Sequence, residues 1–238
     1  MTGSDGPPAR GSDNARVVSL LPSVTETLHA WGLDPIACTR FCERPDLPHV
    51  GGTKDPDVPA IVALRPDLVV VDEEENRRED AEALRAAGLE LLITSVRSVA
   101  DVAPTLQRLA AALGAPDPGG HVTDGRHAPA VSAFVPIWRR PWMTINGDTY
   151  GSSLLAAAGI GNVFAADADR YPTLVDLEVA ARRAPDRVVA PSEPFPFTER
   201  HRTELETVAP TTFVDGQDLF WWGVRTPAGI ERLTAVLR

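Results

Sequence analysis

The second half of the chain repeats the pattern of the first half, and this repeat constrains the fold more than any other feature. Residues 61–72 (IVALRPDLVVVD) and 179–190 (VAARRAPDRVVA) both run from a helix end through Pro-Asp into a β-branched segment. Each is followed by an acidic loop, a charged helical stretch and a further strand, at 89–95 and 211–216. Strands and helices that alternate at this spacing predict parallel sheets with right-handed crossovers. The expected fold is therefore α/β, with two Rossmann-like lobes and a ligand cleft between them.

The chain is long enough, at 238 residues, for two lobes of ordinary size. We expect an N-terminal lobe at 16–114 and a C-terminal lobe at 133–238. Residues 1–15 are rich in Gly, Pro, Ser and Asp, which is typical of a disordered tail. Residues 115–132 hold several Gly and Pro, which disfavour a continuous helix, so they predict a linker or a shortened helix between the lobes.

The hydrophobic pattern also predicts individual elements. Ser23 and Glu26 have capping-box spacing at the start of the first helix. In the second lobe we expect a strand pair at 133–138 and 142–146. Helices are expected there at 151–158, 173–183, 198–208 and 226–237.

Composition excludes some partners. The net charge of −10 argues against nucleic acid, because phosphate binding requires a basic surface. No apolar run approaches the ~20 residues of a membrane span. The N-terminal segment lacks the apolar stretch of a secretory signal, so the chain as written predicts a cytoplasmic protein, or a periplasmic or extracytoplasmic one if an export signal has been removed. We expect a monomer.

Aromatic residues gather in loops and strand ends of the second lobe. Trp138, Trp142, Trp221 and Trp222 lie there together with Phe195. Single loop aromatics often cover a core, but flat apolar rings beside a cleft suit a large planar or conjugated ligand. They are therefore candidate ligand-binding residues.

Two glutamates occupy matching places in the repeat. Glu74 follows a strand in the first lobe, and Glu193 follows the equivalent strand in the second. They are either solvated surface acids, ligand-binding groups in the cleft, docking points for a partner, or the acid/base of an enzyme. The residues alone leave these readings open.

No established catalytic motif is present. The chain lacks a nucleophile elbow, a Walker phosphate loop and a zinc-hydrolase helix, and its five histidines show no metal-ligand spacing. Cys42, four residues after Cys38, is either a small buried apolar residue or a soft axial ligand to the metal of a bound chelate. We expect no cofactor of the protein's own and no catalytic residue.

Several segments resemble a known family. RVVSLLPSVTETLHAWGL, HVGGTKDPD and ALRPDLVVVDEEEN are similar to the class III periplasmic binding proteins for cobalamin and iron–siderophore chelates. The segments WRRPWMTINGD, RYPTLVDLE, SEPFPF and VDGQDLFWWGVR resemble the cobalamin-binding-like branch, often called helical backbone metal receptors. The resemblance covers residues 16–237 and implies two rigidly joined lobes with a chelate between them: cobalamin, haem or a ferric siderophore.

The resemblance also implies roles for particular residues. Trp221 matches the tryptophan that packs on the corrin ligand, and Arg225 would donate hydrogen bonds beside it. Glu79 and Glu199, near the starts of equivalent helices, would dock onto arginines of an ABC importer permease. Together with the candidates already argued from the residues, the expected ligand-binding positions also include Ser23, Phe41, Cys42, Gly52, Glu74, Trp138, Trp142, Asp148, Tyr150, Glu193, Phe195 and Trp222.

The function we expect is therefore a substrate-binding protein for a cobalamin-like or other metal chelate, of the type that serves ABC importers, or a cytosolic homologue of one. The alternatives are a cytosolic enzyme on the same scaffold that uses Glu193 or Glu74, and an interaction module that binds no ligand.

Overall fold

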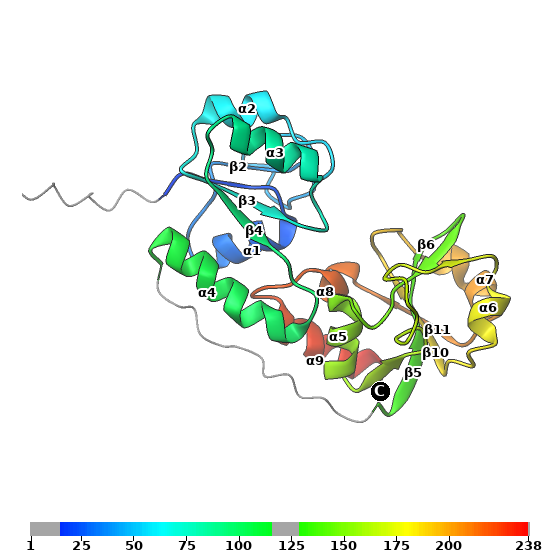
Figure 1. The fold of residues 1–238 in the computed structure, drawn as a ribbon. Helices are drawn as coiled ribbons and strands as arrows, with labels where there is room; N and C mark the ends of the chain where they lie inside the picture. Colours follow the sequence, from blue (N-terminus) through cyan, green and yellow to red (C-terminus); the bar gives the residue numbers. More distant parts are fainter. Residues whose placement is uncertain (1–14, 116–128, 238) are drawn as a thin grey trace, which may run out of the picture.

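The computed structural model describes residues 15–115 and 129–237. The expected tail up to residue 14, and residues 116–128 of the expected linker, lie outside the described residues. Two α/β lobes follow one another along the chain, with helices packed between them (Figure 1).

The first lobe contains one parallel sheet with the strand order β2-β1-β3-β4. Its strands pair in register, for example Val18 with Val69 across β1 and β3. The bounds of its elements are β1 (Val17–Ser19), α1 (Pro22–Ala30), β2 (Ala37–Cys38), α2 (Val58–Leu64), β3 (Leu68–Asp72), α3 (Arg78–Ala86), β4 (Leu91–Thr94), the 3₁₀ turn η1 (Val99–Asp101) and α4 (Val102–Leu113).

The second lobe contains a parallel sheet with the order β8-β5-β10-β11. Taken in chain order, both sheets follow the same 2-1-3-4 arrangement, which confirms the repeat and the α/β fold. The bounds of its elements are β5 (Val131–Phe134), β6 (Pro136–Trp138), β7 (Trp142–Thr144), α5 (Tyr150–Ala157), β8 (Ile160–Asn162), β9 (Thr173–Leu174), α6 (Glu178–Ala181), β10 (Arg187–Pro191), the 3₁₀ turn η2 (Glu199–His201), α7 (Arg202–Leu205), β11 (Thr211–Val214), α8 (Gly216–Phe220) and α9 (Thr226–Leu237).

The second lobe departs from the sequence prediction at its inserted sheet. Strands β6, β7 and β9 form a separate three-stranded antiparallel sheet. The helix predicted at 173–183 is wrong, because residues 173–174 pair with β7 and only α6 is helical. The helix predicted at 198–208 is shorter, ending at Leu205, whereas 226–237 is helical as predicted.

The capping box predicted at Ser23 and Glu26 is also wrong. Leu21 is the N-cap of α1, without a side-chain hydrogen bond, and Pro22 occupies the first helical position. Proline suits that position because its missing N–H would have no partner there. Glu26 instead forms an ion pair with Arg225 of the second lobe, with 2.6 Å between Oε1 and Nη2.

Alternating strand residues divide the core into three clusters. Val69 and Val71 of β3 face the outer cluster under α2 and α3, whereas Leu68 and Val70 face a central cluster. In the second sheet Val189 faces the same central cluster, and its neighbours face a separate outer cluster. This period of two is the expected geometry of strands that are buried on both faces.

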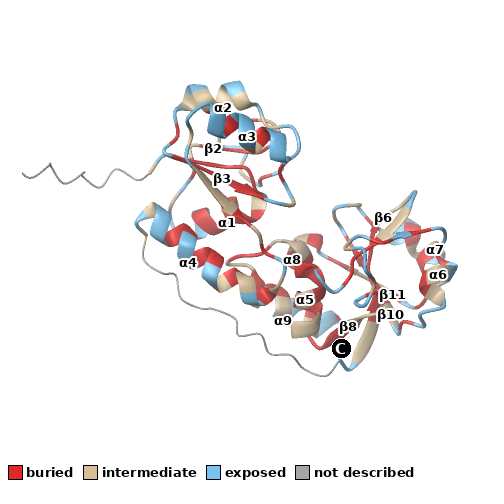
Figure 2. Cartoon of the chain, viewed as in Figure 1, coloured by how far each residue is buried: buried red, intermediate tan, exposed pale blue. Residues whose placement is uncertain are grey.

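The central cluster belongs to both lobes. It contains buried side chains of α1 and α4 from the first lobe and of α5 and α9 from the second. Figure 2 shows buried residues on these helices where they meet between the sheets. Because the apolar core runs uninterrupted from one lobe to the other, the lobes pack as one unit on this side.

A loop of the second lobe also lies against α1. The N–H of Val224 donates to Oγ1 of Thr27 over 3.4 Å, and Gly223 lies against the same side chain. A second contact joins α5 to η1, where Oγ of Ser153 accepts a hydrogen bond from the N–H of Val99 over 3.0 Å. These contacts fix the relative position of the strand ends that line the cavity described next.

Candidate functional site

A cavity of about 710 Å³ lies between the lobes. Its walls come from the loops after β1, β3, β10 and β11 and from the start of α5. The strand order changes direction between β1 and β3 in the first sheet and between β5 and β10 in the second. Ligands of open parallel sheets bind at such points, beyond the carboxyl ends of the strands. The volume is within the range of ligand sites in proteins.

One wall of the cavity is aromatic. Phe220, Trp221 and Trp222 line it at the end of α8, and Tyr150 lines it at the start of α5. The Tyr150 hydroxyl is 2.8 Å from Oγ1 of Thr226, and burial raises the pKa of this phenol above its usual value. These rings present a rigid apolar surface to any molecule in the cavity.

The cavity lining also contains five acidic side chains. Glu43, Asp72, Glu74, Glu75 and Glu193 line the cavity. Burial raises the pKa of the Glu193 carboxyl, although a hydrogen bond with Trp221 acts in the other direction. Burial likewise raises the pKa of Asp72, whose carboxylate accepts from Oγ1 of Thr94 over 2.7 Å.

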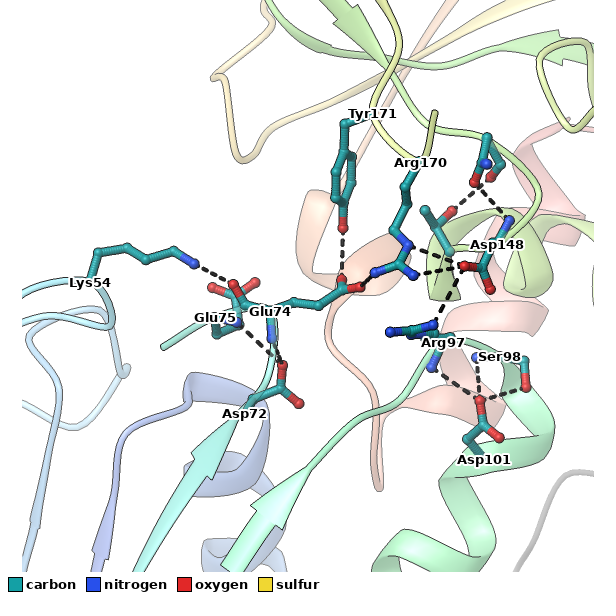
Figure 3. A network of polar contacts seen from close by, with 12 residues as sticks. Lys54, Asp72, Glu74, Glu75, Arg97, Ser98, Asp101, Asp148, Arg170 and Tyr171 are labelled. Carbon is teal, nitrogen blue, oxygen red and sulfur yellow. Dashed lines mark hydrogen bonds and ion pairs between the residues drawn. The ribbon is translucent and has the colours of Figure 1, made fainter. Parts of the chain in front are cut away.

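A polar network connects the lobes at one side of the cavity (Figure 3). The Glu74 carboxylate forms an ion pair with Arg170 and accepts a hydrogen bond from the Tyr171 hydroxyl, at 2.7 Å. Nη2 of Arg170 also donates to Oδ2 of Asp148 over 2.8 Å. The Nζ of Lys54 donates to the backbone carbonyl of Glu74. Both carboxylate oxygens of Glu74 are thus engaged by the second lobe.

The structure brings half of the predicted ligand-binding residues together in this cavity. They come from both lobes and include the two matched glutamates: Ser23, Phe41, Glu74, Tyr150, Glu193, Trp221 and Trp222. The side chain of Phe41 is the most open of the aromatic ones, with 53% of its surface exposed.

Other predicted residues lie just behind the lining. Asp148 holds Arg170, which lines the cavity. The Arg225 guanidinium lies 5.5 Å from the centre of the Trp221 ring and bridges Glu26 and Asp218. Gly52 precedes the lining residue Thr53, and a Cβ on it would collide with the Arg40–Asp55 ion pair.

Three predicted aromatic residues lie outside the cavity lining. Trp142 stacks on Phe197, with 6.0 Å between ring centres and an angle of 6° between the planes. Trp138 and Phe195 meet edge to face at 5.7 Å. Phe195 also contacts Phe197, so these rings form a second aromatic cluster. Trp142 and Phe195 pack against the outer core of the second lobe, whereas 43% of Trp138 is exposed.

Cys42 is buried and also lies outside the lining. Its sulfur lies 3.2 Å from Oγ1 of Thr25 and 3.3 Å from Oγ1 of Thr39. The pKa of this thiol is lowered chiefly by a hydrogen bond from Cys38 and then by those hydroxyls. Within residues 15–115 and 129–237, no group of three or more His, Cys, Asp or Glu side chains is arranged to hold a metal ion.

Sequence reasoning did not single out several lining residues. Arg170 and Tyr171 lie in a loop beyond the strand ends, and Glu75 and Gln217 were not distinguished from their polar neighbours. Arg170 and Tyr171 do belong to the RYPTLVDLE segment that carries part of the family resemblance. Their contact with Glu74 crosses between lobes, so no local pattern predicts it.

Fold and site together define a two-lobed α/β protein with a cavity at the interface between the lobes. The periplasmic binding protein family model matches residues 17–209, and the chain belongs to this family. Within residues 15–115 and 129–237, no helix is long and apolar enough to cross a membrane.

Individual relatives are similar over most of the chain. The vitamin B12-binding protein of Vibrio parahaemolyticus is 27% identical over 204 residues, which cover 78% of this chain and 71% of the relative. The crystal structure of the periplasmic vitamin B12 binding protein of Vibrio cholerae superposes with a TM-score of 0.76 at 19% identity, covering 94% and 96% of the two chains. The periplasmic heme-binding protein of Roseiflexus sp. RS-1 gives 0.76 at 22% identity, covering 94% and 98%.

Proposed function

We propose that the protein binds a large planar metal chelate of the cobalamin or haem type between its lobes and delivers it to an ABC importer outside the cytoplasmic membrane. The aromatic wall of Phe220, Trp221 and Trp222 is the observation that carries this proposal. Such rings cover the apolar face of a flat ligand, while polar groups of both lobes contact its edge. The names of the relatives, which bind vitamin B12 or heme, support the same ligand class.

The proposed role is binding without catalysis. Both carboxylate oxygens of Glu74 are already paired with Arg170 and Tyr171, so Glu74 is poorly suited to act as a general base. The enzymatic alternative therefore depends on Glu193. Product formation from a bound chelate that Glu193→Gln abolishes, with binding retained, would favour that alternative.

Tryptophan fluorescence tests the proposal directly. The purified protein is titrated with cobalamin, cobinamide, haem and a ferric siderophore. We expect saturable quenching by a corrinoid or by haem in the wild type, and a loss of affinity in Trp221→Ala. Trp142→Phe is the matched control, because this ring lies outside the cavity lining and phenylalanine preserves its stacking on Phe197. Absence of binding by every chelate, or equal loss in both variants, would contradict the proposal.

Delivery to an importer would use the exposed acids at the tips of the lobes. The side chain of Glu79 is 69% exposed at the start of α3, and that of Glu199 is 74% exposed in η2. These two elements follow β3 and β10, which occupy the same place in the repeated sheet order. Charges at such positions attract complementary arginines of a partner.

The docking role has a separate test. In vesicles that contain the cognate importer, Glu79→Gln with Glu199→Gln should lower chelate uptake and leave chelate affinity unchanged. Glu178→Gln with Glu82→Gln is the control pair, since Glu82 shares α3 with Glu79 and Glu178 is an exposed acid of α6 in the second lobe. Unchanged uptake in the Glu79/Glu199 variant would contradict this docking role and leave the binding proposal intact.

A further inference from the structure

The charge of the cavity lining gives information about the edge of the ligand. Among the described residues, five carboxylates line the cavity against two cations, Lys54 and Arg170. We propose that this cavity selects chelates whose edge carries amide or cationic groups and rejects chelates whose edge carries carboxylates. This inference rests on the proposed function and assigns the discrimination to Glu75 and Glu193.

Both cations of the lining are already occupied by protein groups. The Arg170 guanidinium is shared between the carboxylates of Glu74 and Asp148. The Lys54 ammonium donates to the backbone carbonyl of Glu74 (Figure 3). A ligand carboxylate that paired with Arg170 would leave Glu74 or Asp148 without its cation, and one that approached Lys54 would share that single positive charge with Glu75.

Glu75 and Glu193 approach the cavity from different lobes. Glu75 follows β3 and Glu193 follows β10, and the charge of Glu75 contributes to raising the pKa of Glu193. Glu75 lines the cavity and is exposed to solvent there. The positive charge of Lys54 acts to lower the pKa of its carboxyl. Glu193 and Trp221 both line the cavity, and Trp221 acts to lower the pKa of the Glu193 carboxyl, so this carboxyl lies beside the aromatic wall.

The remaining acids do not reduce this negative charge. A third carboxylate, that of Glu43, accepts a hydrogen bond from Nε2 of Gln217 over 2.8 Å, which joins the lobes through a neutral partner. The pKa of the Glu193 carboxyl is raised by burial first and then by the charges of other acids, including Glu75 and Glu43. The cavity therefore already disfavours the negative charge that it contains.

The physical consequence is a difference between two kinds of chelate edge. Amide N–H groups donate to carboxylates, and a hydrogen bond to a charged acceptor is stronger than a neutral one. A carboxylate in the same place offers no donor when ionised and is repelled by Glu75 and Glu193 at reduced dielectric screening. Corrinoids with amide side chains fit this requirement, whereas haem, with two propionates, does not.

The test uses two ligands that differ only at the edge. Cobinamide, whose side chains are amides, is compared by isothermal titration calorimetry with cobinamide in which one side-chain amide has been hydrolysed to the carboxylate, each regioisomer being measured separately. We expect at least one regioisomer to bind about tenfold more weakly than cobinamide, or worse, and haem to bind more weakly still. Equal affinities for cobinamide and all of its carboxylates would overturn the inference.

Variants assign the effect to the two acids. Glu75→Gln with Glu193→Gln should reduce the discrimination between amide and carboxylate toward unity, because glutamine preserves shape and removes charge. Glu73→Gln is the control, since Glu73 is an exposed neighbour that does not line the cavity. Discrimination that persists in the double variant would also overturn the assignment.

The outcomes separate this inference from the proposed function. If no chelate binds the wild type, the proposed function fails. If haem and the carboxylates bind as tightly as cobinamide, the function stands and the charge selection is wrong.

Discussion

The contact between Gly223 and α1 gives the sharpest prediction about how the lobes are joined. Gly223 has a φ of +122°, and a Cβ there would lie 2.3 Å from Oγ1 of Thr27. Gly223→Ala therefore combines backbone strain of about 1–3 kcal/mol with a collision against a fully buried side chain. The loop has to retreat, which weakens the hydrogen bonds from Val224 to Thr27 and from Gly223 to Thr226, each about 1 kcal/mol. We expect a total loss of about 3 kcal/mol.

The assay is urea unfolding followed by circular dichroism, with two comparison variants. Gly32→Ala has a φ of +72° with no atom within 4 Å, so it should show the strain without the collision, about 1 kcal/mol. Adding Thr27→Ala to Gly223→Ala removes the obstructing hydroxyl, so the double variant should lose less than the sum of the single variants. A cost for Gly223→Ala no larger than that for Gly32→Ala, or strict additivity, would refute the close approach.

Three further predictions concern ionisable groups. Burial raises the pKa of Glu193, so the contribution of this carboxyl to stability is present below the ordinary value of 4.5 and is lost as pH rises through the folded value. Glu193→Gln should therefore be more thermally stable than the wild type at neutral pH. A difference in melting temperature that does not depend on pH would contradict this. Glu74→Ala removes an ion pair and a hydrogen bond between half-buried groups, so it should lower the free energy of unfolding in urea by about 1 kcal/mol. Glu73→Ala is the control, and an equal loss in both variants would count against the interlobe network. Cys42 should be the first thiol to ionise, because its pKa is lowered chiefly by a hydrogen bond from Cys38 and then by the hydroxyls of Thr25 and Thr39; a thiolate absorbance midpoint that is unchanged in Cys42→Ser would contradict this.

The repeated topology could be predicted from the sequence because it depends on local patterns. Pro-Asp followed by a β-branched run marks β3 and β10, and their shared place in both sheet orders follows from the repeat. Residues just after those strands, Glu74 and Glu193, reach the cavity for the same reason.

The elements that failed depend on contacts distant in sequence. The segment at 173–174 has helix-compatible neighbours, but pairing with β7 makes it a strand. Glu26 has capping-box spacing, yet an arginine almost two hundred residues away pairs with it. Trp142 and Trp221 look equivalent as loop aromatics, and only packing separates the outer core from the cavity wall. Local patterns carry no information about such partners.

The measurement that tests the central claim most directly is hydrogen–deuterium exchange of the protein with and without saturating cobinamide. A chelate between the lobes should protect backbone amides in both lobes together, at 21–23 and 72–75 in the first and at 149–151 and 217–222 in the second. Exchange around Trp142 and Phe197, outside the lining, should not change. Protection confined to one lobe, or to the outer aromatic cluster, would contradict a binding site between the lobes.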